Sequence, residues 1–246
     1  MNIILIYFAI KYKGDWDAIY KALETKERVS LNDLKELEAN LSQGHFQAIT
    51  ILDLDYPERL KKAYKPPFVL FYEGNKELLK GNLTSLTGDA TNDLLLKKIK
   101  ENTHEMLKNK TCLTTMRNGV DEEVYKIALK TKTPTIFIGM NGLNEINKAS
   151  KLKLSNETLK ISELPNDTGV NKKRIQARNR IIAALSDKLV LYSSNKNSGL
   201  MNLVTQFLNM GKDIYCFPDL GEKEQGNSEL IKQGAYLITT HEDLNR

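Results

Sequence analysis

The spacing of hydrophobic residues along the chain changes near residue 48. Before that point apolar residues recur every three to four positions, as in Trp16, Tyr20 and Leu23, and a serine opens the stretch SLNDLKELEANL. This spacing and the serine cap are typical of amphipathic helices. After residue 48, short apolar runs alternate with stretches in which apolar residues recur at helical spacing. We therefore predict an N-terminal helical segment over residues 1–48, either a small domain or a lid, and a second domain over residues 49–246.

Eight short apolar runs in the second region predict β-strands. They cover residues 68–72, 83–88, 112–115, 134–139, 159–164, 189–192, 214–217 and 236–238. Helical spacing separates most of these runs, and strands that alternate with helices are typical of an α/β fold with a doubly wound, mostly parallel sheet. Pro66 and Pro67 precede the first run. Because proline cannot donate to a ladder, we expect that strand at an edge of the sheet.

The most strongly patterned stretch is NKKRIQARNRIIAALSDKLVLYSSNKNSG, residues 171–199. It predicts a basic helix, then a strand, then a turn of small polar residues that opens another helix. The basic helix carries five cations, which are Lys172, Lys173, Arg174, Arg178 and Arg180. In doubly wound sheets a turn between a strand's carboxyl end and a helix is where polar ligands bind.

The basic helix and the turn together predict a site for phosphates. Arg178 and Arg180 offer guanidinium forks, and Asn179 offers an amide that could read a base edge. Ser198 and Gly199 open the next helix, where backbone N–H groups suit a phosphate oxygen. Each feature also has an ordinary explanation. The cations could form ion pairs that tie the helix to neighbouring loops, and Ser198 could be a simple N-cap.

Composition narrows the possible functions only slightly. The 246 residues include 36 Lys+Arg and 31 Asp+Glu, a net charge of +5, which permits an anionic partner without requiring one. Cys112 and Cys216 lie in separate apolar runs, so we expect buried free thiols. Three histidines in no recognised spacing predict no metal site and no cofactor. The apolar start NIILIYFAI is too short to span a bilayer, so we expect a cytoplasmic protein without membrane contact.

Two separated stretches carry a family pattern. One is DYPERLKKAYKPPFVLFYEGNKELL, residues 55–79; the other is RNRIIAALSD followed by NSGL, GKDIYCFP and LIKQGA. In this order they resemble the DprA/Smf family of DNA-processing proteins. The resemblance covers about residues 50–243 and implies an extended Rossmann-like fold. It also implies a homodimer that binds single-stranded DNA without catalysis and loads it onto a RecA-type recombinase during uptake of transforming DNA. Because the chain ends just after its last predicted helix, we expect no C-terminal winged-helix domain.

Two segments of the family pattern near the predicted phosphate site match this chain only in part. Where the family usually has Gly-Ser-Arg, this chain has Gly88, Asp89 and Ala90. An acidic residue would repel phosphate, so we expect Asp89 to cap the following helix. Gly119 matches the family and would supply a positive φ or a close backbone approach, while the basic residue before it is displaced to Arg117. The resemblance thus adds Gly88, Arg117 and Gly119 to the candidate site.

Further substitutions gather at the same rim. Relative to the family, Ile175 stands in place of part of a Phe-Pro pair, Ser193 in place of a glutamate and Asp219 in place of a glycine. Asp121 matches the family, either as a helix cap or as a ligand contact, and Glu163 is expected to cap a neighbouring helix. These substitutions predict weakened or altered binding. Two alternatives therefore stay open: a sensor of a small nucleotide, and a scaffold that has lost its DNA site.

Related nucleotide hydrolases of the LOG type place a glycine-rich loop with a catalytic glutamate and arginine after the corresponding strand. This chain has Tyr192-Ser193-Ser194-Asn195 there. The sequence also contains no nucleophile elbow and no P-loop. We therefore expect a protein that is not an enzyme.

Overall fold

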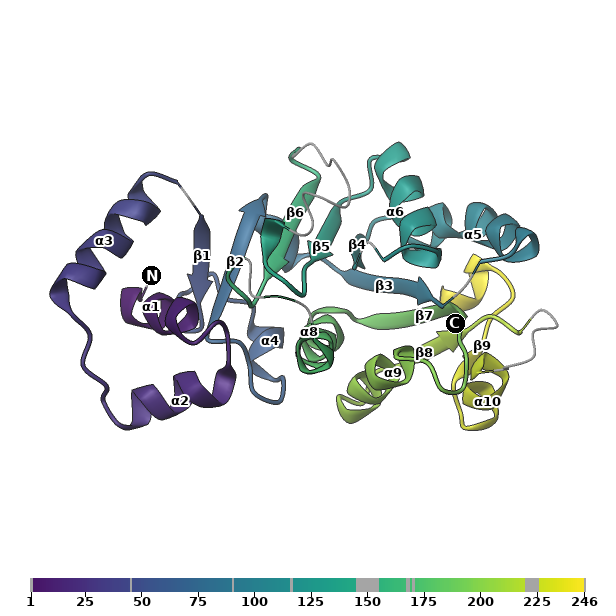
Figure 1. Ribbon diagram of the computed structural model, residues 1–246. Coiled ribbons are helices and arrows are strands. Elements are labelled where there is room, and N and C mark those ends of the chain that lie inside the picture. Colours follow the sequence, from purple (N-terminus) through teal and green to yellow (C-terminus); the bar gives the residue numbers. More distant parts are fainter. Residues whose placement is uncertain are drawn as a thin grey trace.

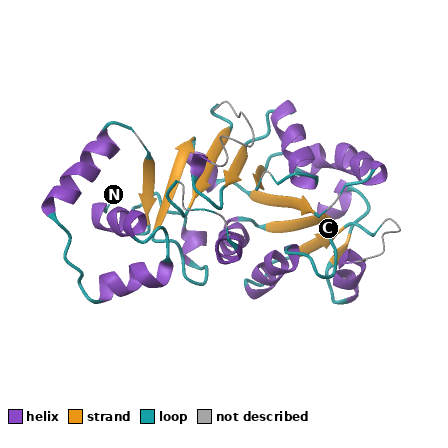
Figure 2. Cartoon of the chain, in the orientation of Figure 1, coloured by secondary structure: helices purple, strands orange, loops and turns teal. Residues whose placement is uncertain are grey.

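A nine-stranded sheet runs through the molecule, with helices on both of its faces (Figures 1 and 2). The computed structural model describes residues 2–44, 46–89, 91–115, 117–144, 155–166, 169, 171–219 and 226–245. The strand order is β1-β2-β6-β5-β4-β3-β7-β8-β9. The pairs β1–β2 and β2–β6 are antiparallel and all other neighbours are parallel. The α/β, mostly parallel sheet predicted from the sequence is confirmed.

The strands lie close to the predicted runs. They are β1 (Gln47–Thr50), β2 (Val69–Gly74), β3 (Leu83–Gly88), β4 (Thr111–Thr114), β5 (Thr135–Ile138), β6 (Thr158–Ser162), β7 (Lys188–Ser193), β8 (Ile214–Cys216) and β9 (Tyr236–Leu237). The helices are α1 (Ile3–Lys11), α2 (Trp16–Glu24), α3 (Leu31–Ser42), α4 (Glu58–Lys61), α5 (Asp93–Met106), α6 (Val120–Lys130), α8 (Lys172–Leu185), α9 (Leu200–Asn209) and α10 (Gly226–Lys232), with short 3₁₀ turns at Lys76–Lys80 and His241–Asn245.

The expectation that the strand after Pro66 and Pro67 lies at a sheet edge is wrong. This strand, β2, pairs with β1 on one side and with β6 on the other. Both prolines precede Val69, the first residue of β2, so neither interrupts the ladder. The edge position belongs to β1, which the sequence did not reveal and which spans the expected boundary at residue 48.

Three buried clusters hold the layers together. One packs α8 and α9 on one face of the sheet, and the second packs α5 and α6 on the other face (Figure 1). The third joins α1, α2 and α3 to β2 and β5, with Val69, Phe71 and Phe137 as its sheet residues. The apolar start of the chain therefore forms α1, whose buried face includes Leu5 and Phe8. Within the described residues no helix is both long enough and apolar enough to cross a bilayer.

Helix α8 has clear capping at both ends. The Asn171 side chain accepts a hydrogen bond of 3.0 Å from the Arg174 N–H, which satisfies one of the free donors of the first turn. At the other end the Lys212 ammonium donates to three backbone carbonyls, those of Ala183, Ala184 and Ser186, at 2.6–2.9 Å. A cation at a helix C-terminus satisfies free carbonyls and complements the helix dipole. Both caps fix the position of α8 on the sheet.

The two cysteines are buried free thiols, as predicted. Burial raises the pKa of Cys112 and of Cys216 to about 12, while a thiol in an unfolded chain has a pKa of about 8.5. The folded chain therefore keeps protons that the unfolded chain loses between these values. The contribution of the two thiols to the free energy of unfolding is fully present below about pH 8.5 and decreases as the pH rises above that value.

We accordingly expect neither thiol to react with Ellman's reagent in the folded protein at pH 8, and both to react rapidly in urea. We also expect a lower free energy of unfolding at pH 10 than at pH 7, measured by urea denaturation under reducing conditions. Reaction of either thiol at the rate of free cysteine without denaturant would contradict the burial described here.

Candidate nucleic-acid interface

The predicted site residues lie where the parallel strands end. Between β3 and β7 the strand order reverses, and this crevice is the usual ligand position in doubly wound sheets. Helix α8 leads into the start of β7, so its N-terminus lies at the carboxyl ends of the parallel strands. The structure divides the predicted residues into two groups, one on α8 and one in the turns after β3, β4 and β7.

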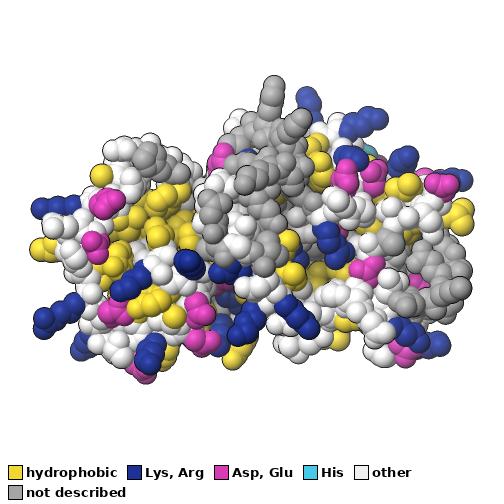
Figure 3. All heavy atoms as spheres, in the orientation of Figure 1, with side chains coloured by type: hydrophobic (Ala, Val, Ile, Leu, Met, Phe, Trp, Pro, Cys, Tyr) yellow, Lys and Arg dark blue, Asp and Glu magenta, His cyan; other side chains and the backbone are white. Residues whose placement is uncertain are grey.

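The first turn of α8 presents its cations to solvent. Lys172 and Lys173 are exposed, and Arg174 is half-buried and donates to the Gly169 carbonyl. Among the described residues no carboxylate lies within ion-pair distance of these three side chains, and the first turn of α8 contains no acidic residue. A helix N-terminus carries partial positive charge of its own. Figure 3 shows Lys and Arg side chains gathered around the position of α8 on this face.

Arg178 and Asn179 lie one turn further along α8 and are less accessible than expected. The Arg178 Nη2 donates to Asn179 Oδ1 at 3.1 Å, and its Nη1 lies 4.0 Å from the sulfur of Met140 in the turn after β5. Asn179 is only 2% exposed and donates to Asn202 Oδ1 of α9 at 3.0 Å. The proposed base contact of Asn179 is therefore corrected: this amide joins α8 to α9.

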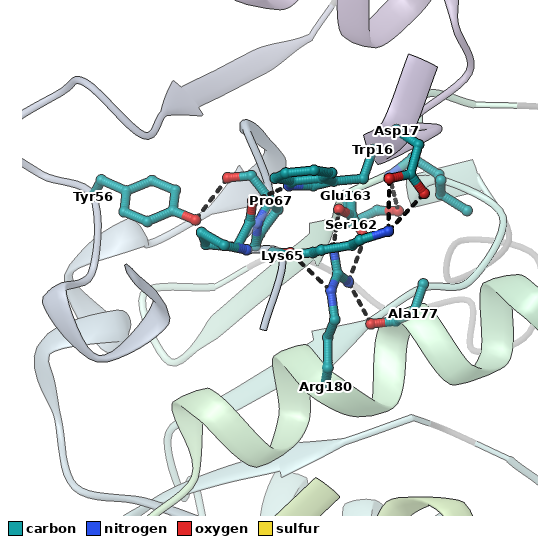
Figure 4. Close-up of polar contacts among 11 residues, drawn as sticks. Trp16, Asp17, Tyr56, Lys65, Pro67, Ser162, Glu163, Ala177 and Arg180 are labelled. Carbon is teal, nitrogen blue, oxygen red and sulfur yellow. Dashed lines mark hydrogen bonds and ion pairs between the residues drawn. The ribbon is translucent and has the colours of Figure 1, made fainter. Parts of the chain in front are cut away.

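Arg180 does not face solvent either. Its guanidinium lies against Glu163 at the end of β6, donating from Nη1 to Oε2 at 2.7 Å and from Nη2 to Oε1 (Figure 4). Its Nε donates to the Lys65 carbonyl at 2.9 Å, and Nη1 also donates to the Ala177 carbonyl. Arg180 is 8% exposed, so its expected role as a phosphate ligand is corrected to a buried ion pair.

The same contact corrects the expectation for Glu163. Both of its oxygens accept from Arg180, so the carboxylate does not cap a helix. Burial raises the pKa of the Glu163 carboxyl above its ordinary value, while the facing guanidinium opposes this rise. The pair fastens α8 to the end of β6.

The turn after β7 already holds a carboxylate. Asp89, in the turn after β3, accepts from the Asn195 N–H at 2.8 Å and from the Ser198 hydroxyl at 2.6 Å. The Ser198 oxygen in turn accepts from the Leu200 N–H at 2.9 Å, and Gly199 is the N-cap residue of α9. Asp89 thus occupies the Ser198 hydroxyl, one of the donors that the sequence assigned to a phosphate.

This arrangement corrects the expectation that Asp89 caps the helix after β3. Asn92 caps α5 instead, accepting from the Leu95 N–H at 2.8 Å. Arg117 reinforces the cluster from the turn after β4, because its Nη2 donates to the Gly88 carbonyl at 2.6 Å and lies 3.7 Å from Asp89 Oδ1.

The two glycines of the cluster are required for different reasons, Gly88 for close packing and Gly119 for its positive φ. A Cβ at Gly88 would lie 2.6 Å from Val120 Cγ2 and 2.9 Å from Ser193 Oγ, so a side chain does not fit there. Gly119 has a φ of +95°, as predicted, and precedes α6. Asp121 is buried and accepts from the Thr87 and Thr115 hydroxyls, so it is neither a helix cap nor a solvent-facing ligand.

Another of the rim substitutions, Asp219, also has a structural contact. Its carboxylate accepts from the Ser228 N–H at 2.7 Å in the first turn of α10. Within the described residues no cluster of three or more His, Cys, Asp or Glu side chains is arranged to hold a metal ion. Each acidic side chain placed above at this edge is held by donors of the protein itself.

The contacts of Asp89 give a testable consequence for stability. We expect Asp89→Ala to lower the free energy of unfolding by about 1–3 kcal/mol, because the partly buried Asn195 N–H and Ser198 hydroxyl lose their acceptor. Urea denaturation measures this loss. Asp93→Ala, at an exposed position in the first turn of α5, is the control and should cost less than about 1 kcal/mol. Equal losses in both variants would contradict the bridging role of Asp89.

Comparison with known proteins places these features in a family. The family model for DNA recombination-mediator protein A matches residues 47–246. DNA processing protein DprA of Streptococcus pneumoniae is 29% identical over 216 residues, which are 84% of this chain and 77% of that protein. DNA processing protein DprA of Bacillus subtilis is 29% identical over 217 residues, 85% of this chain and 73% of that protein.

Solved structures share the fold. The X-ray structure of DprA from Streptococcus pneumoniae superposes with a TM-score of 0.75 at 24% sequence identity, over 99% of this chain and 92% of that one. DNA processing protein A from Helicobacter pylori, described for its single-stranded DNA binding mode, superposes with a TM-score of 0.69 at 22% identity, over 82% of this chain and 95% of that one. These structures show the fold, and the family match over most of the chain's length shows that the chain belongs to the DNA recombination-mediator protein A family.

Proposed function

We propose that this protein binds single-stranded DNA through the first turn of α8. The observation that carries the proposal is the set of three basic side chains, Lys172, Lys173 and Arg174, at a helix N-terminus without an acidic partner among the described residues. Cations of this kind neutralise backbone phosphates, and the release of counterions provides the binding free energy. The helix dipole adds to the same potential.

The comparisons support the choice of partner. The related protein from Helicobacter pylori is described as binding single-stranded DNA, and the matching family is named for mediating recombination. We therefore propose that the bound strand is passed to a RecA-type recombinase in the cytoplasm and that the protein acts as a homodimer. The N-terminal helical segment, residues 1–48, would pack on this binding domain as a lid, because α1, α2 and α3 share a buried cluster with β2 and β5.

We propose that this binding involves no chemical reaction. General acid–base catalysis needs a titratable group within reach of the substrate. The carboxylates described at this edge are instead bound by protein donors: Asp89 by the turn after β7, Asp121 by two threonines and Glu163 by Arg180. These contacts favour a binding surface over a reaction centre.

The contacts of Asp89 in the turn after β7 also favour DNA binding over the main alternative, a sensor of a small nucleotide. Such a sensor would use the Ser198 turn and the arginines of α8 for the phosphates of its ligand, but the Ser198 hydroxyl is bound to Asp89 and Arg180 is bound to Glu163. The cations of the first turn of α8 lie outside the Ser198 turn, and Lys172 and Lys173 are exposed, so they do not enclose a single small ligand. Binding should therefore depend on the length of the oligonucleotide.

Fluorescence anisotropy with labelled oligo-dT tests this function. We expect a strand of about 20–30 nucleotides, which covers typical site sizes, to bind at low salt and to bind much more tightly than thymidine monophosphate or a dinucleotide. Equal affinity for the monophosphate and the long strand would favour the nucleotide sensor. Absence of binding to any of the three at low salt would contradict DNA binding altogether.

A further inference from the structure

A column of three aromatic rings joins α2 to the loop before β2. The Trp16 ring stacks on Phe68 with centroids 5.1 Å apart and on Tyr20 with centroids 5.2 Å apart, at interplanar angles of 22° and 9°. The Trp16 Nε1 donates to the Pro66 carbonyl at 2.8 Å, which fixes the middle ring. Tyr20 ends the column and is 49% exposed. The column therefore presents an aromatic ring to solvent.

A second exposed ring lies close to this column. Tyr64 is 77% exposed, and the Lys65 ammonium lies 5.6 Å from its centroid and 5.3 Å from that of Trp16. The Lys65 ammonium thus lies near the rings of both Tyr64 and Trp16, at distances typical of cation–π contacts. Packing against the loop before β2 explains the buried parts of Trp16 and Phe68. It does not explain why two tyrosines beside them remain open to solvent.

Lys65 connects these rings to α8. Its backbone carbonyl accepts from Arg180 Nε, as Figure 4 shows, and Arg180 lies seven residues after Lys173. Seven residues are nearly two helical turns, so Lys173 and Arg180 project from the same side of α8, about 10 Å apart along the axis. The exposed rings and the exposed cation therefore lie along one side of the same helix.

From this arrangement we propose that the exposed rings of Tyr20 and Tyr64, supported by Trp16 and Lys65, form an aromatic ledge that stacks the bases of a single-stranded nucleic acid. The inference rests on the proposed function, because the phosphates of the same strand would be held by the first turn of α8. Aromatic side chains stack bases with little sequence preference, since every base has a π-face.

The charge of the ledge makes its contribution distinguishable from that of α8. The Lys65 ammonium is paired with Asp17 at 2.6 Å, so this pair adds little net positive charge. The ledge should therefore act on the bases and not on the phosphates. Removing a ring should weaken binding to a normal strand without changing the dependence of the affinity on salt, whereas removing a cation of α8 should change that dependence.

An abasic strand tests the ledge directly. Anisotropy is measured for labelled oligo-dT and for an abasic deoxyribose-phosphate oligomer of the same length, with the full chain and with Tyr64→Leu, Tyr20→Leu and Tyr64→Phe. We expect the wild type to bind oligo-dT more tightly, and each leucine variant to lose roughly fivefold or more of its affinity for oligo-dT alone. Tyr64→Phe keeps the ring and should bind like the wild type.

Tyr236→Leu is the matched control, because Tyr236 is an exposed tyrosine on β9 at the opposite edge of the sheet and should not affect binding. Thermal unfolding by circular dichroism confirms that each variant is folded. Equal affinity of the wild type for both strands, or leucine variants that keep the preference for bases, would overturn the ledge while leaving DNA binding by α8 intact. Failure of the wild type to bind either strand would overturn both.

Discussion

Replacing Arg180 with methionine is expected to lower the free energy of unfolding by about 3–5 kcal/mol, because it leaves the Glu163 carboxylate buried without its partner. The side chains of Arg180 and Glu163 are 9% and 8% exposed, and both terminal guanidinium nitrogens donate to the carboxylate. Arg180→Met also removes the donor to the Lys65 carbonyl, so the contact between α8 and the loop before β2 weakens as well. Urea denaturation followed by circular dichroism measures the loss.

The companion variants show whether the loss comes from the ion pair. Glu163→Met should be destabilising by a similar amount, whereas the double variant Arg180→Met/Glu163→Met should be much less destabilised than the sum of the two, since replacing both members of a buried pair is often neutral or stabilising. Arg178→Met is the neighbouring control on α8. Additive losses in the double variant would show that the two residues do not act as a pair.

Removing the three cations of the first turn of α8 should have the largest effect on binding. At 0.1 M salt each phosphate contact of a single strand contributes a factor of about five, so Lys172→Ala/Lys173→Ala/Arg174→Ala is expected to bind oligo-dT about 100-fold more weakly. Anisotropy titrations measure the change. The fold should be unaffected, because these side chains are exposed or half-buried and make no ion pair with a described residue.

A second triple variant controls for net charge. Lys35→Ala/Lys108→Ala/Lys130→Ala removes the same number of cations from exposed positions on α3, just after α5 and at the end of α6. We expect its affinity for oligo-dT to stay within a few-fold of the wild type, since charges more than about 10 Å from the strand are screened at this salt concentration. Similar losses in both triples would indicate a general charge effect and no specific site on α8.

The elements that the sequence predicted best are those whose signal is local. The run over residues 83–88 forms β3 with the same bounds, and the basic stretch forms α8 from Lys172 to Leu185, because apolar periodicity and capping depend on neighbouring residues. Strand β1 was missed because its four residues follow a helix and carry no clear alternation. Its pairing with β2 is a long-range contact that the spacing does not reveal.

The candidate site was harder to predict because its polar contacts join distant parts of the chain. Arg180 is 17 residues from Glu163, and Asp89 is 106 residues from Asn195. The second contact exists because β3 and β7 are neighbours where the strand order reverses. The sequence showed which residues are polar and basic. It did not show which of them the fold would turn inward, and so it overestimated the number of free phosphate ligands.

The dependence of the DNA affinity on salt tests the account most directly. For single strands the slope of log affinity against log salt is about −0.7 for each phosphate contact. We expect the wild type to show a linear, negative slope, and the triple variant of Lys172, Lys173 and Arg174 to show a slope smaller in magnitude by about 2, while the control triple keeps the wild-type slope. An unchanged slope in the α8 variant would contradict the claim that the first turn of α8 holds the phosphates.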